Sequence, residues 1–216
     1  MINFCIILQQ ELRNIANSYA KILQHILFFF ISLAIFYLIA AKDDAIRSNF
    51  DHDFAIILFC LIFTIILAYN NFLKQDYEDG TLEQVSLAQP HLEIYVAAKI
   101  IALWLTYCLP VVLCLFASYL FLNDIIFAIQ FALTTTIATL ATSFICAFCN
   151  SLALISNDIS LIAILILPLT IPTLLISAAA LSQSYNNSIF FLFGILIVFA
   201  PMSIIASTAI IKIANE

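Results

Sequence analysis

The residue types that could bind a metal ion or carry a redox reaction occur in this chain, but their spacing does not favour such chemistry. Two of the six cysteines, Cys146 and Cys149, have CxxC spacing. Covalent haem attachment would need a histidine directly after such a pair, and Asn150 stands there instead. Both cysteines fall at the end of an apolar block, where a free cysteine behaves as a small apolar residue. We therefore predict no redox or metal role for them.

The three histidines and the two glycines are also widely separated. His25, His52 and His91 have no spacing that predicts convergence on one metal ion. Gly80 and Gly194 lie far apart, and the sequence has no GxxxxGKS or GxxxxGKT phosphate-binding loop. We predict no catalytic residue, no metal site and no bound cofactor in this chain. If ATP drives this protein, another chain must supply the ATP site.

The segment best suited to act on a partner is the polar stretch from Lys74 to Lys99, which separates two apolar blocks. A tight connection between two helices needs only a few residues, so a segment of this length predicts more than a turn. We predict that it docks onto a soluble partner; the alternative is a solvated loop whose acids keep it out of the lipid. It holds five of the thirteen acidic residues, namely Asp76, Glu78, Asp79, Glu83 and Glu93.

Local signals in this stretch predict a short amphipathic helix at about 81–89. The preceding glycine can adopt backbone angles that other residues avoid, so it can end the segment before the helix. Thr81 and Gln84 have the capping-box spacing of a helix start. Leu82 and Val85 then fall on one helical face.

The composition predicts a membrane environment for the rest of the chain. The 216 residues are 65% hydrophobic and only 9% charged, whereas a soluble globular protein is nearer one-quarter charged. We predict an all-α integral membrane protein with a single transmembrane domain over residues 1–216. The formal net charge of −6 indicates no particular ligand, because the distribution of charge among loops is what matters in a membrane protein. No nucleic-acid partner is predicted.

Six apolar blocks are each close to the roughly 20 residues that a helix needs to cross a bilayer. Residues 1–21 come before them and have apolar residues at helical spacing, which predicts an amphipathic interfacial helix. The first apolar block is too long for a signal peptide, so we expect this segment to be retained. The blocks lie at about 22–41, 54–73, 97–122, 125–149, 159–181 and 188–211, with a polar loop at 74–96.

The basic residues predict that both termini lie in the cytoplasm. In that orientation five of the seven basic residues lie inside, where basic loop residues accumulate. The polar stretch is then cytoplasmic as well. The inside residues are Arg13, Lys21, Lys74, Lys99 and Lys212, and the outside residues are Lys42 and Arg47.

Two spans have unusual interiors. In the fourth, Thr135, Thr139, Thr142 and Cys146 share a helical face, which predicts close helix packing within one subunit; a seam at a subunit interface or along a transport path is the alternative. Helix-kinking prolines stand in the third and fifth spans, where each removes a helical hydrogen bond. These prolines are Pro110, Pro168 and Pro172.

The run Gln75-Asp76-Tyr77-Glu78-Asp79-Gly80-Thr81-Leu82-Glu83-Gln84 resembles the signature of the haem exporter B (CcmB) family of cytochrome c maturation. Ala98-Lys99, Leu109-Pro110, Leu167-Pro168-Leu169 and Ile171-Pro172 are similar to that family too. Together with the six-span layout, the resemblance covers nearly the whole chain. Cys108 departs from the glycine expected before Leu-Pro, which bears on the packing of the third span.

The resemblance implies an ABC-2-like exporter permease in the bacterial inner membrane. Such subunits pair with a second copy of themselves and with an ATP-binding subunit, here CcmA-like, and they work with other membrane subunits of the cytochrome c maturation complex. The 74–96 loop would be the coupling loop and residues 1–21 the elbow helix. Haem is a possible substrate, and release of a haem-loaded periplasmic chaperone is the other possible outcome of ATP hydrolysis. The coupling residues would be Asp76, Tyr77, Glu78, Asp79, Gly80, Thr81, Leu82, Glu83, Gln84 and Val85.

Two alternatives remain open from the sequence. One is a scaffold for haem-handling proteins without ATPase coupling, which would not stimulate an ATPase. The other is a secondary transporter, which would usually carry ionisable residues deep within its spans. The predicted span interiors lack acidic and basic residues, which disfavours the second alternative.

Overall fold

The computed structural model describes residues 4–16, 19–40, 50–70, 72–88, 92–122, 125–156, 159–182 and 185–214. Every regular element in these ranges is helical. In chain order they are α1 (Phe4–Ala16), α2 (Tyr19–Ala40), α4 (Phe50–Tyr69), α5 (Lys74–Glu78), α6 (Thr81–Ala88), α7 (Leu92–Leu103), the π-helix η1 (Trp104–Cys108), α8 (Leu109–Leu122), α9 (Ile125–Ser156), α10 (Ile159–Ser182) and α11 (Tyr185–Ala214).

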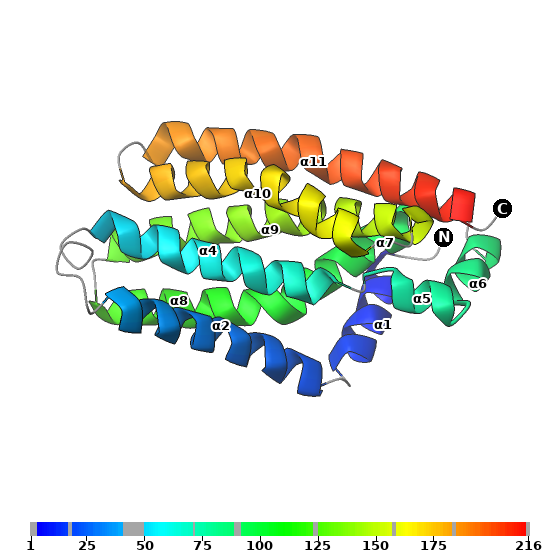
Figure 1. Ribbon diagram of the computed structural model, residues 1–216, viewed down its shortest axis with the longest axis horizontal. Coiled ribbons are helices and arrows are strands. Elements are labelled where there is room, and N and C mark those ends of the chain that lie inside the picture. Colours follow the sequence, from blue (N-terminus) through cyan, green and yellow to red (C-terminus); the bar gives the residue numbers. More distant parts are fainter. Residues whose placement is uncertain are drawn as a thin grey trace.

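Within these ranges, six helical segments are long and apolar enough to cross a membrane. They are built on α2, α4, the continuous α7–η1–α8 segment, α9, α10 and α11, and Figure 1 shows them side by side along the long axis of the molecule. The predicted all-α membrane fold with six spanning helices is thereby confirmed. The depth of each helix in the bilayer and the treatment of residues 1–216 as one domain stay predictions.

Several helix ends differ from the predicted block boundaries; α9, for example, continues to Ser156 rather than ending at 149, and two further ends have a clear local cause. α4 ends at Tyr69 rather than at 73 because the chain turns there, and the Phe72 amide donates to the Tyr69 carbonyl at 2.9 Å. α7 begins at Leu92, ahead of the third apolar block. Its first turn carries the exposed Glu93, so hydropathy alone places the start of the helix too late.

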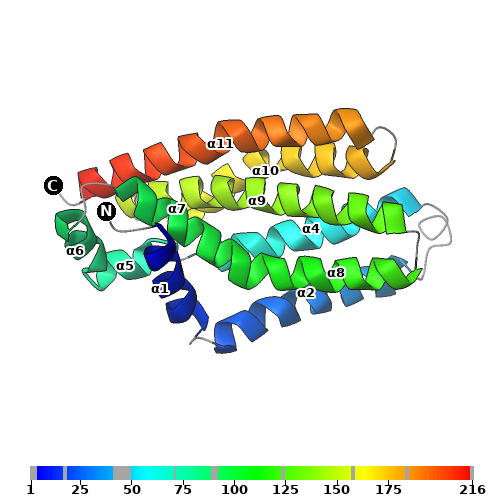
Figure 2. The same ribbon diagram turned by 180° about the vertical axis from the view of Figure 1, so that it is seen from behind.

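The helix α1 runs across one end of the bundle (Figures 1 and 2). Its apolar side packs on α7: Ile7 is buried, and Leu8 and Ile15 lie against the same core cluster. The amphipathic helix predicted within 1–21 is confirmed over Phe4–Ala16, while its position at a membrane interface stays a prediction. The helices α5 and α6 and the last turns of α11 lie at this same end, which we call the polar end.

At the opposite end, which we call the far end, four aromatic rings hold α4, α8 and α9 together. The centroid of Phe54 lies 5.3 Å from that of Phe127 and 5.7 Å from that of Phe131. Tyr119 of α8 stacks on Phe131 at 4.3 Å. Phe131 is fully buried, so this cluster fixes the spacing of three helices through aromatic packing.

The hydroxyl face of α9 is buried in the middle of the bundle. Thr135, Thr139 and Thr142 are each at most 1% exposed, and their hydroxyls donate to carbonyls of the preceding turn. The Trp104 indole N–H of η1 also donates to the Thr139 hydroxyl at 3.1 Å. These contacts agree with packing inside one subunit, because small hydroxyl residues allow neighbouring helices to approach closely.

The third span contains a π-turn directly before its proline. The Leu109 amide donates to the Trp104 carbonyl, five residues back, and Pro110 follows. Proline lacks an N–H and its ring clashes with the carbonyl one turn earlier, so a wider turn relieves that clash. Pro168 and Pro172 lie inside α10, which remains helical through both. The kinks assigned to these prolines stay predictions.

Candidate functional site

The polar stretch folds into two short helices, α5 and α6, which together form the α5–α6 hairpin (residues 74–88). Gly80 joins them with φ at +70°, in the left-handed region that favours glycine. The Asp79 amide donates to Gln75 and the Gly80 amide donates to Tyr77, which closes the end of α5. The predicted helix at 81–89 and the breaking role of Gly80 are confirmed, whereas α5 was not predicted.

The start of α6 differs from the predicted capping box. The Gln84 amide donates to the Gly80 carbonyl at 3.4 Å, which makes Thr81 the first residue of the helix rather than its cap. The Thr81 hydroxyl instead donates to the Asp76 carbonyl at 2.9 Å. In a capping box the threonine hydroxyl would accept a hydrogen bond from a backbone N–H of its own helix. Here it donates to a carbonyl of α5, and this bond ties the two helices of the hairpin together.

A buried ion pair attaches the hairpin to α7. Asp76 accepts a hydrogen bond from the Tyr95 hydroxyl at 2.7 Å and pairs through the same oxygen with the Lys99 ammonium. Lys99 is 7% exposed, and the carboxylate of Glu11 on α1 acts electrostatically on both Lys99 and Tyr95. Lys99 was predicted from the sequence as a cytoplasmic charge and as part of the family resemblance, and this pairing was not predicted. The sequence offered only the presence of an acid within the polar stretch and of a lysine where the stretch meets the next apolar block. It gave no pattern that pairs these two residues, which lie 23 positions apart.

Leu82 does not lie where the sequence predicted. As part of the predicted docking segment, the apolar face of Leu82 and Val85 was expected to meet a partner, but Leu82 is 1% exposed and belongs to this chain's own core cluster. Val85 is half-buried against the same cluster. Spacing identifies the apolar face of a helix but not the surface that covers it. Leu82 therefore holds α6 on the bundle and is unavailable to a partner in this structure.

The outward side of the hairpin is polar. Glu78, Asp79 and Glu83 are exposed and form what we call the acidic rim, with Thr81 and Gln84 exposed beside them. Of these residues, Asp79, Thr81 and Gln84 also border the cavity described below. Glu78 lies 3.9 Å from Lys74, one turn before it, in an exposed pair. Tyr77 is 43% exposed, and its hydroxyl donates to the Ala214 carbonyl at 3.5 Å, near the end of α11.

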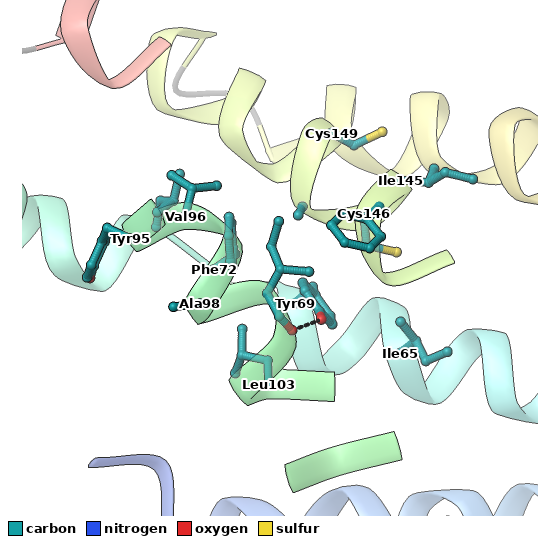
Figure 3. Packing of buried hydrophobic residues seen from close by; sticks show 14 of the residues in the cluster. Ile65, Tyr69, Phe72, Tyr95, Val96, Ala98, Leu103, Ile145, Cys146 and Cys149 are labelled. Atoms are coloured by element: carbon teal, nitrogen blue, oxygen red, sulfur yellow. Dashed lines mark hydrogen bonds between the residues drawn. The ribbon is translucent and has the colours of Figure 1, made fainter. Parts of the chain in front are cut away.

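The core beneath the hairpin is closely packed around Tyr69, the last residue of α4. Its side chain is fully buried, and its hydroxyl donates to the Ile100 carbonyl of α7 at 2.8 Å (Figure 3). Phe72, Val96 and Cys146 from the same cluster surround this contact (Figure 3). The end of α4 is thus bonded to α7, and Cys146 of α9 packs in the same cluster.

A cavity of about 850 Å³ opens next to the ion pair, between α1, α2, the end of α4, the hairpin, α7 and η1. Lys99, Tyr95 and Asp76 lie on one side of it. Lys21 and His25 of α2 lie on another. The volume is within the roughly 300–1,000 Å³ range of small-molecule and cofactor sites.

Other predicted chemistry falls outside the site or outside the described residues. His91 and the loop before α4 are not described. Cys146 and Cys149 are free thiols buried in the core cluster. Among the side chains that the structure describes, no three His, Cys, Asp or Glu residues gather into a group that could hold a metal ion.

This chain is similar to known proteins over nearly its whole length. The family model described as CcmB protein matches residues 2–214. The chain is 26% identical to Heme exporter protein B of Haemophilus influenzae, with 99% of each chain covered. It is 28% identical to Heme exporter protein B of Pseudomonas aeruginosa, over 85% of this chain and 82% of that protein. The protein of that name from Bradyrhizobium diazoefficiens is 31% identical, over 68% of this chain and 64% of its own length.

Proposed function

The chain belongs to the CcmB protein family, and from this membership we propose that it is the membrane permease subunit of an ATP-driven haem export system. Relatives named Heme exporter protein B match it nearly end to end, which supports haem as the cargo. ATP would be hydrolysed by a separate CcmA-like subunit. The complex would include a second copy of this chain and further membrane subunits of cytochrome c maturation.

The single observation that best supports this proposal is the attachment of the α5–α6 hairpin. One side of the hairpin is fixed to α7 by the Asp76–Lys99 ion pair and by burial of Leu82. The other side presents the acidic rim. A segment that is fixed to a membrane helix and also exposes charge is suited to transmit movement between a soluble subunit and the bundle.

The route of that movement follows from the contacts. A displacement of the hairpin acts on Asp76, then on Lys99 of α7, and α7 continues through the π-turn η1 into α8. The acidic rim would meet basic side chains of the ATP-binding subunit, and such charges set register and association rate more than affinity. ATP-driven rearrangement would then move haem or release a haem-loaded chaperone.

The proposed orientation puts the polar end in the cytoplasm of a bacterial cell, in the inner membrane. Five of the seven basic residues support this orientation by the positive-inside rule. The ATP-binding subunit would then contact the hairpin from the cytoplasm.

Charge reversal on the acidic rim tests the coupling role. The variant Glu78→Lys/Asp79→Lys should lower stimulation of the partner ATPase several-fold, because two acids would become basic at the contact. The matched control is Glu93→Lys, which makes the same change at an exposed acid on α7, outside the hairpin. Full stimulation in the double variant, with loss in the control, would contradict the proposal. Leu82→Ala reports hairpin stability instead, because Leu82 is covered by the chain itself.

A further inference from the structure

The cavity at the polar end holds a histidine whose two ring nitrogens have different roles. His25 of α2 lines the cavity and is half-buried. Its Nδ1 lies 2.6 Å from the Lys21 carbonyl oxygen, one turn earlier on the same helix. A carbonyl can only accept, so Nδ1 is the protonated nitrogen of the pair. In the neutral ring the lone pair then stands on Nε2.

This arrangement is the one that metal-ligating histidines use. Such a histidine commonly donates its other ring N–H to a carbonyl or carboxylate, which fixes the tautomer and the orientation of the ring. The His25 ring is also held by Tyr107 of η1, with ring centroids 4.5 Å apart. The imidazole is thus oriented by a hydrogen bond on one edge and by an aromatic ring on its face.

The walls of the cavity suit a flat, amphipathic molecule. Phe28, one turn after His25, lines the cavity and is 37% exposed, within the apolar outer face of α2. Phe28 therefore gives the cavity an aromatic side chain close to the apolar surface of α2. Tyr107 and Leu103, both buried, add aromatic and aliphatic surface to the cavity.

The charges in the cavity are distributed unevenly. Asp76 is neutralised by Lys99, and Glu11 also acts on Lys99. Lys21 lies on the same helical face as His25, one turn away, and is exposed. An anionic group on a ligand held at His25 would meet this ammonium, whereas Asp76 already has Lys99 as its counter-charge.

We propose that this cavity is a haem site, with Nε2 of His25 as axial ligand to the iron and Lys21 as partner of a propionate. The proposal rests on haem export as the proposed function and names where this chain first holds its cargo. The lone pair of Nε2 forms a coordination bond to iron and displaces a bound water, with no change in oxidation state. Haem iron in proteins is commonly held by such a proximal histidine. A single protein ligand also permits release, which a transport site requires.

The test is a haemin titration of the full-length chain purified in detergent, followed by absorbance in the Soret region. The wild-type chain should give a saturable shift. His25→Gly should weaken binding at least tenfold, and added imidazole should restore the spectrum by occupying the place of the lost ring. Leu23→Ala changes an exposed residue of the same helix that is not among the residues lining the cavity. It is the matched control and should bind as the wild-type chain does.

Iron-free protoporphyrin separates ligation from folding. Its fluorescence should show equal binding to the wild-type chain and to His25→Gly, because the walls remain and no iron is present. An identical Soret spectrum in His25→Gly and wild type, as expected for haem dissolved in detergent or lipid, would overturn the site. The site would also be overturned if His25→Gly lost haem binding, imidazole did not restore it, and the iron-free porphyrin still bound to the variant.

The same preparations distinguish failure of the site from failure of the proposed function. His25→Gly should still assemble with the ATP-binding subunit, since His25 lies on α2 and not on the hairpin. A wild-type complex that contains the ATPase but binds haem independently of His25 would overturn the site alone. His25-dependent haem binding by a chain that never assembles with an ATPase would overturn the ATP-driven function alone.

Discussion

The two ends of the bundle are held together by different forces. At the far end, the rings of Phe54, Tyr119, Phe127 and Phe131 pack α4 against α8 and α9. At the polar end, an apolar core around Tyr69 is supplemented by one ion pair and a few long-range hydrogen bonds, which join α5 and α4 to α7 beside a cavity of about 850 Å³.

The difference indicates which end is built to move. Close aromatic packing has one preferred arrangement and resists deformation. Ionic contacts next to a cavity can exchange partners, and elements joined by them can shift as bodies. We therefore expect changes at the far end to affect stability alone, and changes at the polar end to affect both stability and coupling.

The largest effect is expected at the ion pair. Asp76→Asn leaves the buried Lys99 without its counter-charge, and breaking a buried pair from one side costs about 3–5 kcal/mol. The apparent Tm of the detergent-purified protein should fall strongly. The control Asp79→Asn removes an exposed acid of the same hairpin and should change the Tm little.

A double variant sharpens this prediction. Asp76→Asn combined with Lys99→Gln removes both charges and should recover much of the lost stability, because no unpaired charge is buried. The ATPase stimulation should remain low, since the connection to α7 is still weakened. Equal Tm values for the single and double variants would show that the pair does not hold the hairpin.

At the far end, Phe131→Ala should cost about 3 kcal/mol, the lower end of the range for a buried phenylalanine. The cost arises because the substitution removes a buried ring and leaves an empty space between α4, α8 and α9. Thermal unfolding measures the loss, and ATPase stimulation at a temperature well below the Tm should stay near wild type. A selective loss of stimulation in a folded variant would remove the contrast between the two ends.

A smaller effect is expected at the joint of the hairpin. Gly80→Ala places a side chain at a φ of +70°, which costs about 1–2 kcal/mol. An added Cβ at Gly80 meets no atom within 4 Å, so the cost comes from the backbone alone. Gly80→Asn should be tolerated better, because asparagine visits this region more readily. Limited proteolysis within 74–88 would report the loosening, and equal cleavage of the Ala and Asn variants would contradict this account.

The smallest effects concern two tyrosine hydroxyls. Tyr69→Phe removes a buried bond of 2.8 Å to Ile100 and should cost about 1 kcal/mol. Tyr77→Phe removes an exposed contact of 3.5 Å to Ala214 and should be close to neutral. Parallel measurement of the two Tm values tests the order, and a reversed order would show that the hairpin–α11 contact stabilises the protein more than the α4–α7 contact does.

The sequence predicted most of the fold because lipid imposes simple rules. Long apolar blocks must be helical in a membrane, since every backbone polar group needs a partner within the segment. The short helix near Thr81–Ala88 also followed from local signals, with Gly80 as its boundary. Helix ends followed less well: α7 extends into polar sequence, and α4 ends in a turn before its apolar block is complete.

The site was predicted only in part, because its contacts are long-range. Asp76 and Lys99 lie 23 residues apart, and no local pattern indicates that they pair. The amphipathic face of α6 was recognised, but its spacing did not reveal that Leu82 is covered by the chain itself. His25 was set aside for lack of nearby histidines, whereas its hydrogen bond and its place on the cavity wall became apparent only in three dimensions.

The most direct test of the central claim is mild-detergent purification of the tagged chain, with identification and counting of every chain that accompanies it. Our account predicts an ATP-binding chain in equal number, and its loss from Glu78→Lys/Asp79→Lys but not from Glu93→Lys. A chain that still emerges without any ATPase under gentler extraction would contradict the account. A scaffold for haem-handling proteins or a secondary transporter would then explain the protein better.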